Sequence, residues 1–108
     1  MDIESLILVG KLGRVISIKD PSGQRVEVAL STPNVEEAKK LGDDDMDVAG
    51  MCSYFISRIG DKEYGPADRE LLKKGLEKIQ GAVLVYINKQ CLELLKEQEQ
   101  FIEELTKK

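Results

Sequence analysis

The chain has 108 residues, of which 42% are hydrophobic and 33% are charged, and its formal net charge is -4. This length fits a single domain of residues 1–108, and the composition is that of a globular protein, not a disordered one. The acidic excess lies in residues 31–65, which hold eight acidic and four basic side chains. Because binding to a phosphate backbone requires clustered Lys and Arg, we expect no nucleic acid as a direct ligand.

Few groups suited to catalysis or cofactor binding occur in the sequence. It contains no histidine, which rules out Ser-His-Asp and Cys-His nucleophile activation and most zinc sites. Cys52 and Cys91 lie on apolar faces of expected helices, where buried free thiols are more common than a disulfide. The apolar stretch 6–9 is too short for a signal sequence or a membrane span. We therefore expect a cytoplasmic protein that is not an enzyme and binds no cofactor, metal, membrane or small-molecule substrate.

An α+β fold is expected, beginning with an antiparallel β-hairpin unit over residues 6–31. Residues 12–19 and 25–30 alternate between apolar and polar side chains, as half-buried strands do. Between them, Asp20, Pro21 and Gly23 occupy their preferred positions in a type I turn. An isolated hairpin is unstable in water. Its apolar face must therefore be covered by helices of this chain or by another chain, and residues 6–9 are a candidate third strand.

Short helices are expected over residues 32–80. Thr32 and Pro33 suit the cap and first position of a helix that ends near Gly42. A second helix should begin near Asp45 and end at Gly60. Its apolar residues at helical spacing are Val48, Cys52, Phe55 and Ile59.

The rest of this region predicts a turn and a third helix. Residues 60–66 form either a loop or a small hairpin, and the third helix covers residues 67–80. A break between Gln80 and Gly81 separates it from the last helix, because glycine favours helix ends. The apolar residues that this third helix should bury are Leu71, Leu72, Leu76 and Ile79.

An acidic cluster precedes the second helix and consists of Asp43, Asp44, Asp45 and Asp47. Oxygen-rich clusters suit calcium or magnesium. With Asp43 as the first position, however, Val48 stands where a calcium loop needs glycine, and Tyr54 stands where it needs glutamate. We therefore interpret these carboxylates as helix-capping groups that complement the helix dipole.

A long amphipathic helix is expected over residues 81–105, followed by a frayed tail of residues 106–108. Spacings of three and four residues alternate along a seam formed by Leu84, Ile87, Cys91, Leu94, Gln98, Phe101 and Leu105. Leu95 and Ile102 widen this apolar stripe. At about 1.5 Å per residue the helix is roughly 37 Å long, longer than a domain of this size is across. Its distal half should therefore project beyond the core.

Two interpretations of this stripe remain open. In the first, the third helix covers it within an intramolecular helical hairpin. In the second, the distal part docks on another protein or on a second copy of the chain, because the third helix is too short to cover residues beyond Leu94. The candidate interaction residues are Leu94, Leu95, Gln98, Phe101, Ile102 and Leu105.

The order of these segments resembles that of small proteins encoded among the tail genes of tailed bacteriophages. The resemblance covers residues 12–105, and its motifs are 12–14 (LGR), 20–23 (DPSG), 55–62 (FISRIGDK) and 94–99 (LLKEQE). It implies a tail or baseplate assembly chaperone, or a minor tail component, that binds other tail proteins without a cofactor or catalytic residues. Such a protein would act in the host cytoplasm or be incorporated in the virion.

A non-enzymatic assembly protein that acts through its C-terminal helix is therefore the leading hypothesis. The alternative is an acidic inhibitor or decoy that occupies a basic site on a host or partner protein. Its surface would be residues 36–47, because the excess negative charge lies in that part of the chain.

Overall fold

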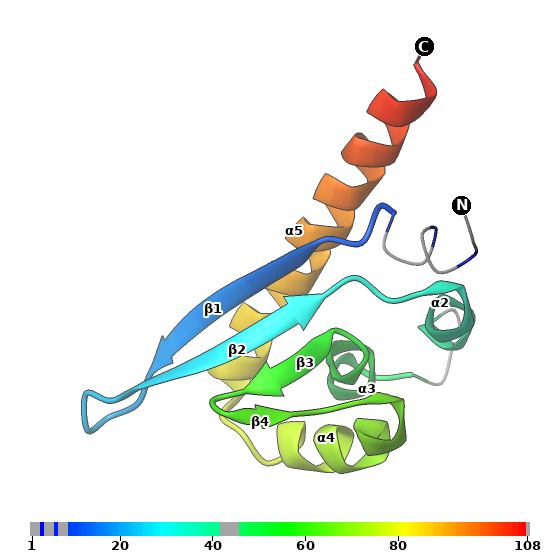
Figure 1. Cartoon of the computed structure of the whole chain (residues 1–108). Coiled ribbons are helices and arrows are strands. Elements are labelled where there is room, and N and C mark those ends of the chain that lie inside the picture. The colour runs from blue at the N-terminus through cyan, green and yellow to red at the C-terminus, as the bar shows by residue number, and fades with distance from the viewer. Residues whose placement is uncertain (1–2, 4–5, 7–8, 42–45, 108) are drawn as a thin grey trace.

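Four strands form one antiparallel sheet in the computed structural model, which describes all residues except 1–2, 4–5, 7–8, 42–45 and 108 (Figure 1). The strands are β1 (Gly13–Lys19), β2 (Arg25–Ser31), β3 (Ile56–Ile59) and β4 (Lys62–Glu63), in the spatial order β1-β2-β3-β4. Helices follow the first hairpin and the last helix is long, so the predicted α+β class is confirmed.

The first hairpin forms where the sequence predicts it. Its register pairs Gly13 with Ser31 at one end and Lys19 with Arg25 at the other. The turn is held by the Asp20 carboxylate and by Gly23, whose φ of 93° is a conformation that glycine adopts without strain. Alternation places one set of apolar side chains on the buried face of the sheet, among them Ile16, Val28 and Leu30.

The third strand is β3, and the prediction that residues 56–59 end a helix is wrong. Helix α3 (Val48–Ser53) stops earlier. The carbonyl of Phe55 then accepts a hydrogen bond of 2.8 Å from the N–H of Ser31, which begins the pairing of β3 with β2. Of the candidate strand 6–9, Leu6 has helical backbone and Val9 lies in a turn, whereas residues 7–8 lie outside the described residues.

The segment after β3 forms the small hairpin, one of the two structures that the sequence allows for residues 60–66. Strand β4 pairs with β3 through Arg58 opposite Glu63 and Ile59 opposite Lys62. Gly60 makes the turn with a φ of 57°. The sheet therefore gains two strands from a region expected to be mainly helical.

Helix α2 (Val35–Leu41) starts later than predicted, because Asn34 and not Thr32 caps it. The Asn34 side-chain oxygen accepts a hydrogen bond of 2.9 Å from the N–H of Glu37. Thr32 is buried, and its hydroxyl accepts a bond of 3.1 Å from the N–H of Leu12. Thr32 thus ties the start of β1 to the end of β2.

Helix α4 (Arg69–Leu76) follows a short 3-10 turn, η1 (Pro66–Asp68), and is shorter than the predicted helix over 67–80. Leu72 and Leu76 are buried as expected, whereas Leu71 is 57% exposed and Ile79 is 36% exposed. The break before Gly81 is confirmed, and Gly81 is the first residue of helix α5 (Gly81–Thr106).

Helix α5 crosses behind the sheet, and its last turns extend beyond the sheet (Figure 1). Helix α3 lies against both α4 and α5. One cluster of buried side chains from the sheet and from α3, α4 and α5 forms the core. Within it Phe55 is fully buried, a burial that stabilises the fold by roughly 1.5–3 kcal/mol. No helix within the described residues is long and apolar enough to cross a membrane.

Candidate functional site

The apolar seam of α5 is divided between the core and the surface. Ile87, Cys91 and Leu94 are buried, with exposed fractions of 3%, 0% and 1%. Two turns farther along the same stripe, Phe101 is 39% exposed and Leu105 is 47% exposed. The stripe therefore leaves the domain in the part of α5 that extends beyond the sheet.

Residues Phe101, Ile102 and Leu105 form what we call the distal surface. Ile102 is 42% exposed, and an open hollow beside it is lined by Gln98, Glu99 and Glu103. The three apolar side chains lie on one face of α5, because they are spaced one, three and four residues apart. This face continues the buried face of the helix.

The other predicted interaction residues lie elsewhere. Leu94 is buried in the core of its own chain, and Leu95 is half-buried and packs against that core. Leu94 therefore offers no surface to a partner. Gln98 is half-buried, and its side-chain amide donates a hydrogen bond of 2.9 Å to the carbonyl of Gly10.

The first half of the seam packs against α3 and lies in one core cluster with side chains of the sheet and of α4, so α4 does not cover it alone as the helical-hairpin interpretation expects. Helix α4 packs on α3. On the side of the sheet, Arg14 of β1 reaches α5, where its guanidinium bonds the side-chain oxygen of Gln90 at 2.8 Å. It also pairs with the carboxylates of Glu93, at 3.3 Å, and Glu97. No sequence pattern predicts this link, since it depends on how β1 lies across α5.

Negative charge predominates in the part of α5 that carries the distal surface. Residues 97–106 contain four glutamates and no Lys or Arg, and these are Glu97, Glu99, Glu103 and Glu104. Arg14 partly neutralises Glu97. Within the part of the chain that the structure describes, no ion pair involves the other three glutamates. The apolar patch therefore has an acidic border.

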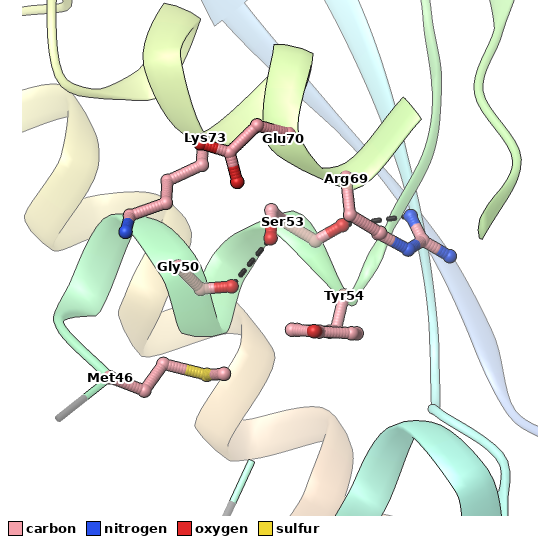
Figure 2. A pocket seen from close by; sticks show the side chains of 7 residues that line it. All are labelled: Met46, Gly50, Ser53, Tyr54, Arg69, Glu70 and Lys73. Atoms are coloured by element: carbon pink, nitrogen blue, oxygen red, sulfur yellow. Dashed lines mark hydrogen bonds between the residues drawn. The ribbon is translucent and has the colours of Figure 1, made fainter. Parts of the chain in front are cut away.

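A second hollow, of about 200 Å³, lies between α3 and α4 (Figure 2). It is lined by Met46, Gly50, Ser53, Tyr54, Arg69, Glu70 and Lys73. The cationic groups of Arg69 and Lys73 lie at opposite sides of it in Figure 2. Two separated cations do not form a clamp for one anion.

The guanidinium of Arg69 is occupied by groups of its own chain. It donates to the carbonyls of Ser53 at 2.8 Å and Ile56 at 3.0 Å, and to the Glu37 carboxylate at 2.8 and 3.1 Å. Its cationic carbon also lies 5.8 Å from the centre of the Tyr54 ring. We therefore assign Arg69 a structural role, in which it joins α2, α3 and β3.

Two carboxylates of the acidic segment 36–47 bind groups of their own chain. Glu37 is paired with Arg69, and the Asp47 carboxylate caps α3 by accepting a bond of 2.8 Å from the N–H of Gly50. Asp43, Asp44 and Asp45 lie outside the described residues. Among the residues that are described, no group of three or more His, Cys, Asp or Glu side chains could hold a metal ion.

No protein-family model, curated protein or solved structure matches the chain. The observations on which a function can be proposed are therefore those of the chain itself. Of its surfaces, the distal surface combines exposed apolar side chains with continuity to the core.

Proposed function

We propose that the protein is a non-enzymatic assembly protein that binds another protein through the distal surface of α5. The observation that carries this proposal is the continuation of one apolar seam from buried Leu94 to exposed Phe101 and Leu105. A helix that served only its own core would have polar residues at these last positions. An apolar stripe that leaves the domain is typical of a surface covered by another protein.

The size of the patch indicates an anchor within a larger contact. Phe101, Ile102 and Leu105 are each about two-fifths to one-half exposed, so covering each would contribute about 1 kcal/mol. A stable interface buries roughly 800 Å² per partner. The partner must therefore also contact neighbouring groups, such as the hollow beside Ile102 and the exposed side chain of Val9.

We further propose that the partner is a component of a phage tail or baseplate, with this protein as an assembly chaperone or a minor structural component. The support for this more specific role is the resemblance of residues 12–105 to small tail proteins. Such a protein needs a binding surface and no catalytic centre. It would work in the host cytoplasm and, as a minor component, remain in the virion.

The alternative of an acidic decoy has weaker support. Two of its acidic side chains, Glu37 and Asp47, already bind groups of their own chain. A decoy surface requires carboxylates that are available to a basic partner. Of the acidic side chains in segment 36–47 that the structure describes, this leaves Glu36, and one carboxylate does not make such a surface.

The test compares two variants of the full chain. Phe101→Asp combined with Leu105→Asp places two negative charges on the distal surface. The control variant, Leu92→Asp, places one negative charge on the opposite face of α5, where the Leu92 side chain is 49% exposed. We expect the double variant to lose the partner that wild type retains in a pull-down from the native source, and Leu92→Asp to retain it. Circular dichroism should show the same helix content in all three proteins.

Equal recovery of the identified partner by wild type and the folded double variant would contradict the proposal. Loss of binding in Leu92→Asp as well would place the interface on a different face of α5.

A further inference from the structure

The charges around the distal surface indicate what kind of partner it accepts. We infer that this partner is an amphipathic helix of another protein, with Lys or Arg flanking its apolar stripe, and that it is not a second copy of α5. The inference rests on the proposed function. It adds the secondary structure and the charge of the partner.

The heptad positions of α5 define two borders of the seam. With Gln98 and Leu105 at position a, Phe101 is at position d and Ile102 is at position e. Glu97 and Glu104 are then at position g. The distal seam therefore has an apolar border on one side and a carboxylate border on the other.

A second copy fits this arrangement poorly in either direction. In an antiparallel pair the g positions of the two helices face each other, so that Glu97 and Glu104 would meet the same two carboxylates of the copy. In a parallel pair each g position of one helix faces an e position of the other helix. Glu97 of one copy would then lie against the apolar side chain of Ile102 of the second copy. The first arrangement brings like charges together, and the second removes water from a carboxylate without a new partner.

A basic helix fits the same borders. Lys or Arg at its flanking positions would face Glu104 and the remaining carboxylate oxygen of Glu97, and other basic side chains would reach Glu103. The aliphatic stems of Lys or Arg would also cover the edges of Phe101 and Ile102. Since the seam of α5 has the spacing of a coiled coil, a helix at the matching spacing covers it best.

The experiment uses the full-length protein and three synthetic peptides, each a helix of three heptads with the same Leu and Ile at positions a and d. Their flanking e and g positions are all Lys, all Gln or all Glu. Binding is measured by fluorescence anisotropy at low and at high salt. We expect the Lys peptide to bind on the order of tenfold more tightly than the Gln peptide at low salt, and the Glu peptide to bind more weakly than both. High salt should reduce these differences.

Two sets of variants assign the binding to the surface. Glu103→Gln with Glu104→Gln should remove most of the preference for the Lys peptide while the Gln peptide binds as before. Glu70→Gln with Glu77→Gln, on and directly after α4, removes the same charge elsewhere and should leave the preference intact. Phe101→Asp should weaken the binding of all three peptides. This result would distinguish binding to the apolar seam from nonspecific attraction of a basic peptide to an acidic protein.

Equal affinity for the Lys and Gln peptides, or a preference that survives Glu103→Gln with Glu104→Gln, would overturn the inference but leave the proposed function standing. If none of the peptides binds, the inference of a helical partner is wrong, whereas the proposed function is still decided by the pull-down. A wild-type dimer in light scattering that Phe101→Asp converts to a monomer would identify a second copy as the occupant and also overturn the inference.

Discussion

Gln98, on the distal half of α5, donates a hydrogen bond of 2.9 Å from its side-chain amide to the carbonyl of Gly10, 88 positions earlier in the chain. Gly10 has a φ of 79°, and a Cβ added to it would lie 3.0 Å from the Cδ1 atom of Ile102. The backbone before β1 thus passes directly against α5. One side of the distal half is therefore contacted by its own chain, while Phe101, Ile102 and Leu105 remain 39%, 42% and 47% exposed.

The first prediction concerns this contact. Gly10→Ala should lower the free energy of unfolding by about 1–2 kcal/mol, because alanine is strained at positive φ and its Cβ would force the end of the Ile102 side chain to shift. Gln98→Ala should lower it by about 1 kcal/mol through loss of the hydrogen bond. Both values can be measured by urea denaturation.

Gly75→Ala is the matched control for Gly10→Ala. Gly75 lies in α4, and an added Cβ would meet nothing within 4 Å. Alanine is the better helix former, so this variant should be more stable by about 0.5–1 kcal/mol. Equal effects of the two glycine substitutions would contradict the close packing of Gly10 on α5.

The hairpin and α5 could be predicted from the sequence because their signals are local. Asp20, Pro21 and Gly23 specify a turn by their own backbone preferences, and the seam of α5 repeats over enough residues to exclude a strand. The segment after α3 could not be assigned in the same way. Phe55 and Ile59 have helical spacing, but Ile56 is also buried, against β2. Only the presence of β2 decides that this segment becomes a strand.

The candidate site was predicted in part. The periodicity located the stripe, but it could not tell where the core ends, because Leu94 and Phe101 occupy equivalent positions in the repeat. A polar residue within an apolar seam, such as Gln98, is typical of one that sets the register of a helix pair. The structure instead gives it Gly10 as a partner, and no sequence pattern links two residues so far apart. The contacts of Arg14 and Arg69 depend on tertiary structure in the same way.

The second prediction concerns Arg69, which holds α2, α3 and β3 together. Arg69→Met should cost about 2–4 kcal/mol of stability, because it leaves the Glu37 carboxylate and the carbonyls of Ser53 and Ile56 without their donor in a half-buried site. Arg69→Lys should recover only part of this loss, since an ammonium group cannot make the same forked set of bonds. Thermal denaturation measures both.

A matched control is Arg58→Met. Arg58 pairs with Glu27 at 3.5 Å, where that glutamate side chain is 60% exposed, and donates one hydrogen bond to the carbonyl of Gly60, so its loss should cost only about 1–2 kcal/mol. If Arg69→Met were no more damaging than Arg58→Met, the guanidinium of Arg69 would not have the structural role assigned to it.

The third prediction concerns Cys52 of α3 and Cys91 of α5, which are fully buried in the same core cluster. The hydrogen bond to Cys52, together with burial, raises the pKa of the Cys91 thiol. Thiolates are the reactive form of cysteine. Because both thiols are also fully buried and closed to a reagent, we expect neither thiol of the native protein to react with an aromatic disulfide reagent at mildly alkaline pH, and both to react in urea.

Leu92→Cys provides the control, because this neighbouring position is 49% exposed. The new thiol should react in the native state, at one equivalent per chain. Rapid labelling of wild type before unfolding would show that α3 and α5 open readily, contrary to the packing of the two cysteines.

The last prediction concerns the turn of the first hairpin. The Asp20 carboxylate accepts hydrogen bonds from the Ser22 hydroxyl at 2.6 Å, from the Ser22 N–H at 2.9 Å and from the Gln24 N–H at 3.0 Å. These bonds, the one from the Ser22 hydroxyl first, lower the pKa of Asp20. The folded state therefore favours the ionised form of Asp20 more than the unfolded chain does.

The direction of the pH effect follows from this difference. Since the folded-state pKa is the lower of the two, the bonds stabilise the fold fully above the unfolded-state pKa of about 3.9. This stabilisation is lost as the pH falls through the folded-state pKa. NMR titration of the Asp20 side chain should give a midpoint below that of the urea-unfolded protein, and Ser22→Ala should move it upward. Identical midpoints in wild type, Ser22→Ala and the unfolded chain would mean that the carboxylate does not hold the turn, and the hairpin would then depend on Pro21 and Gly23 alone.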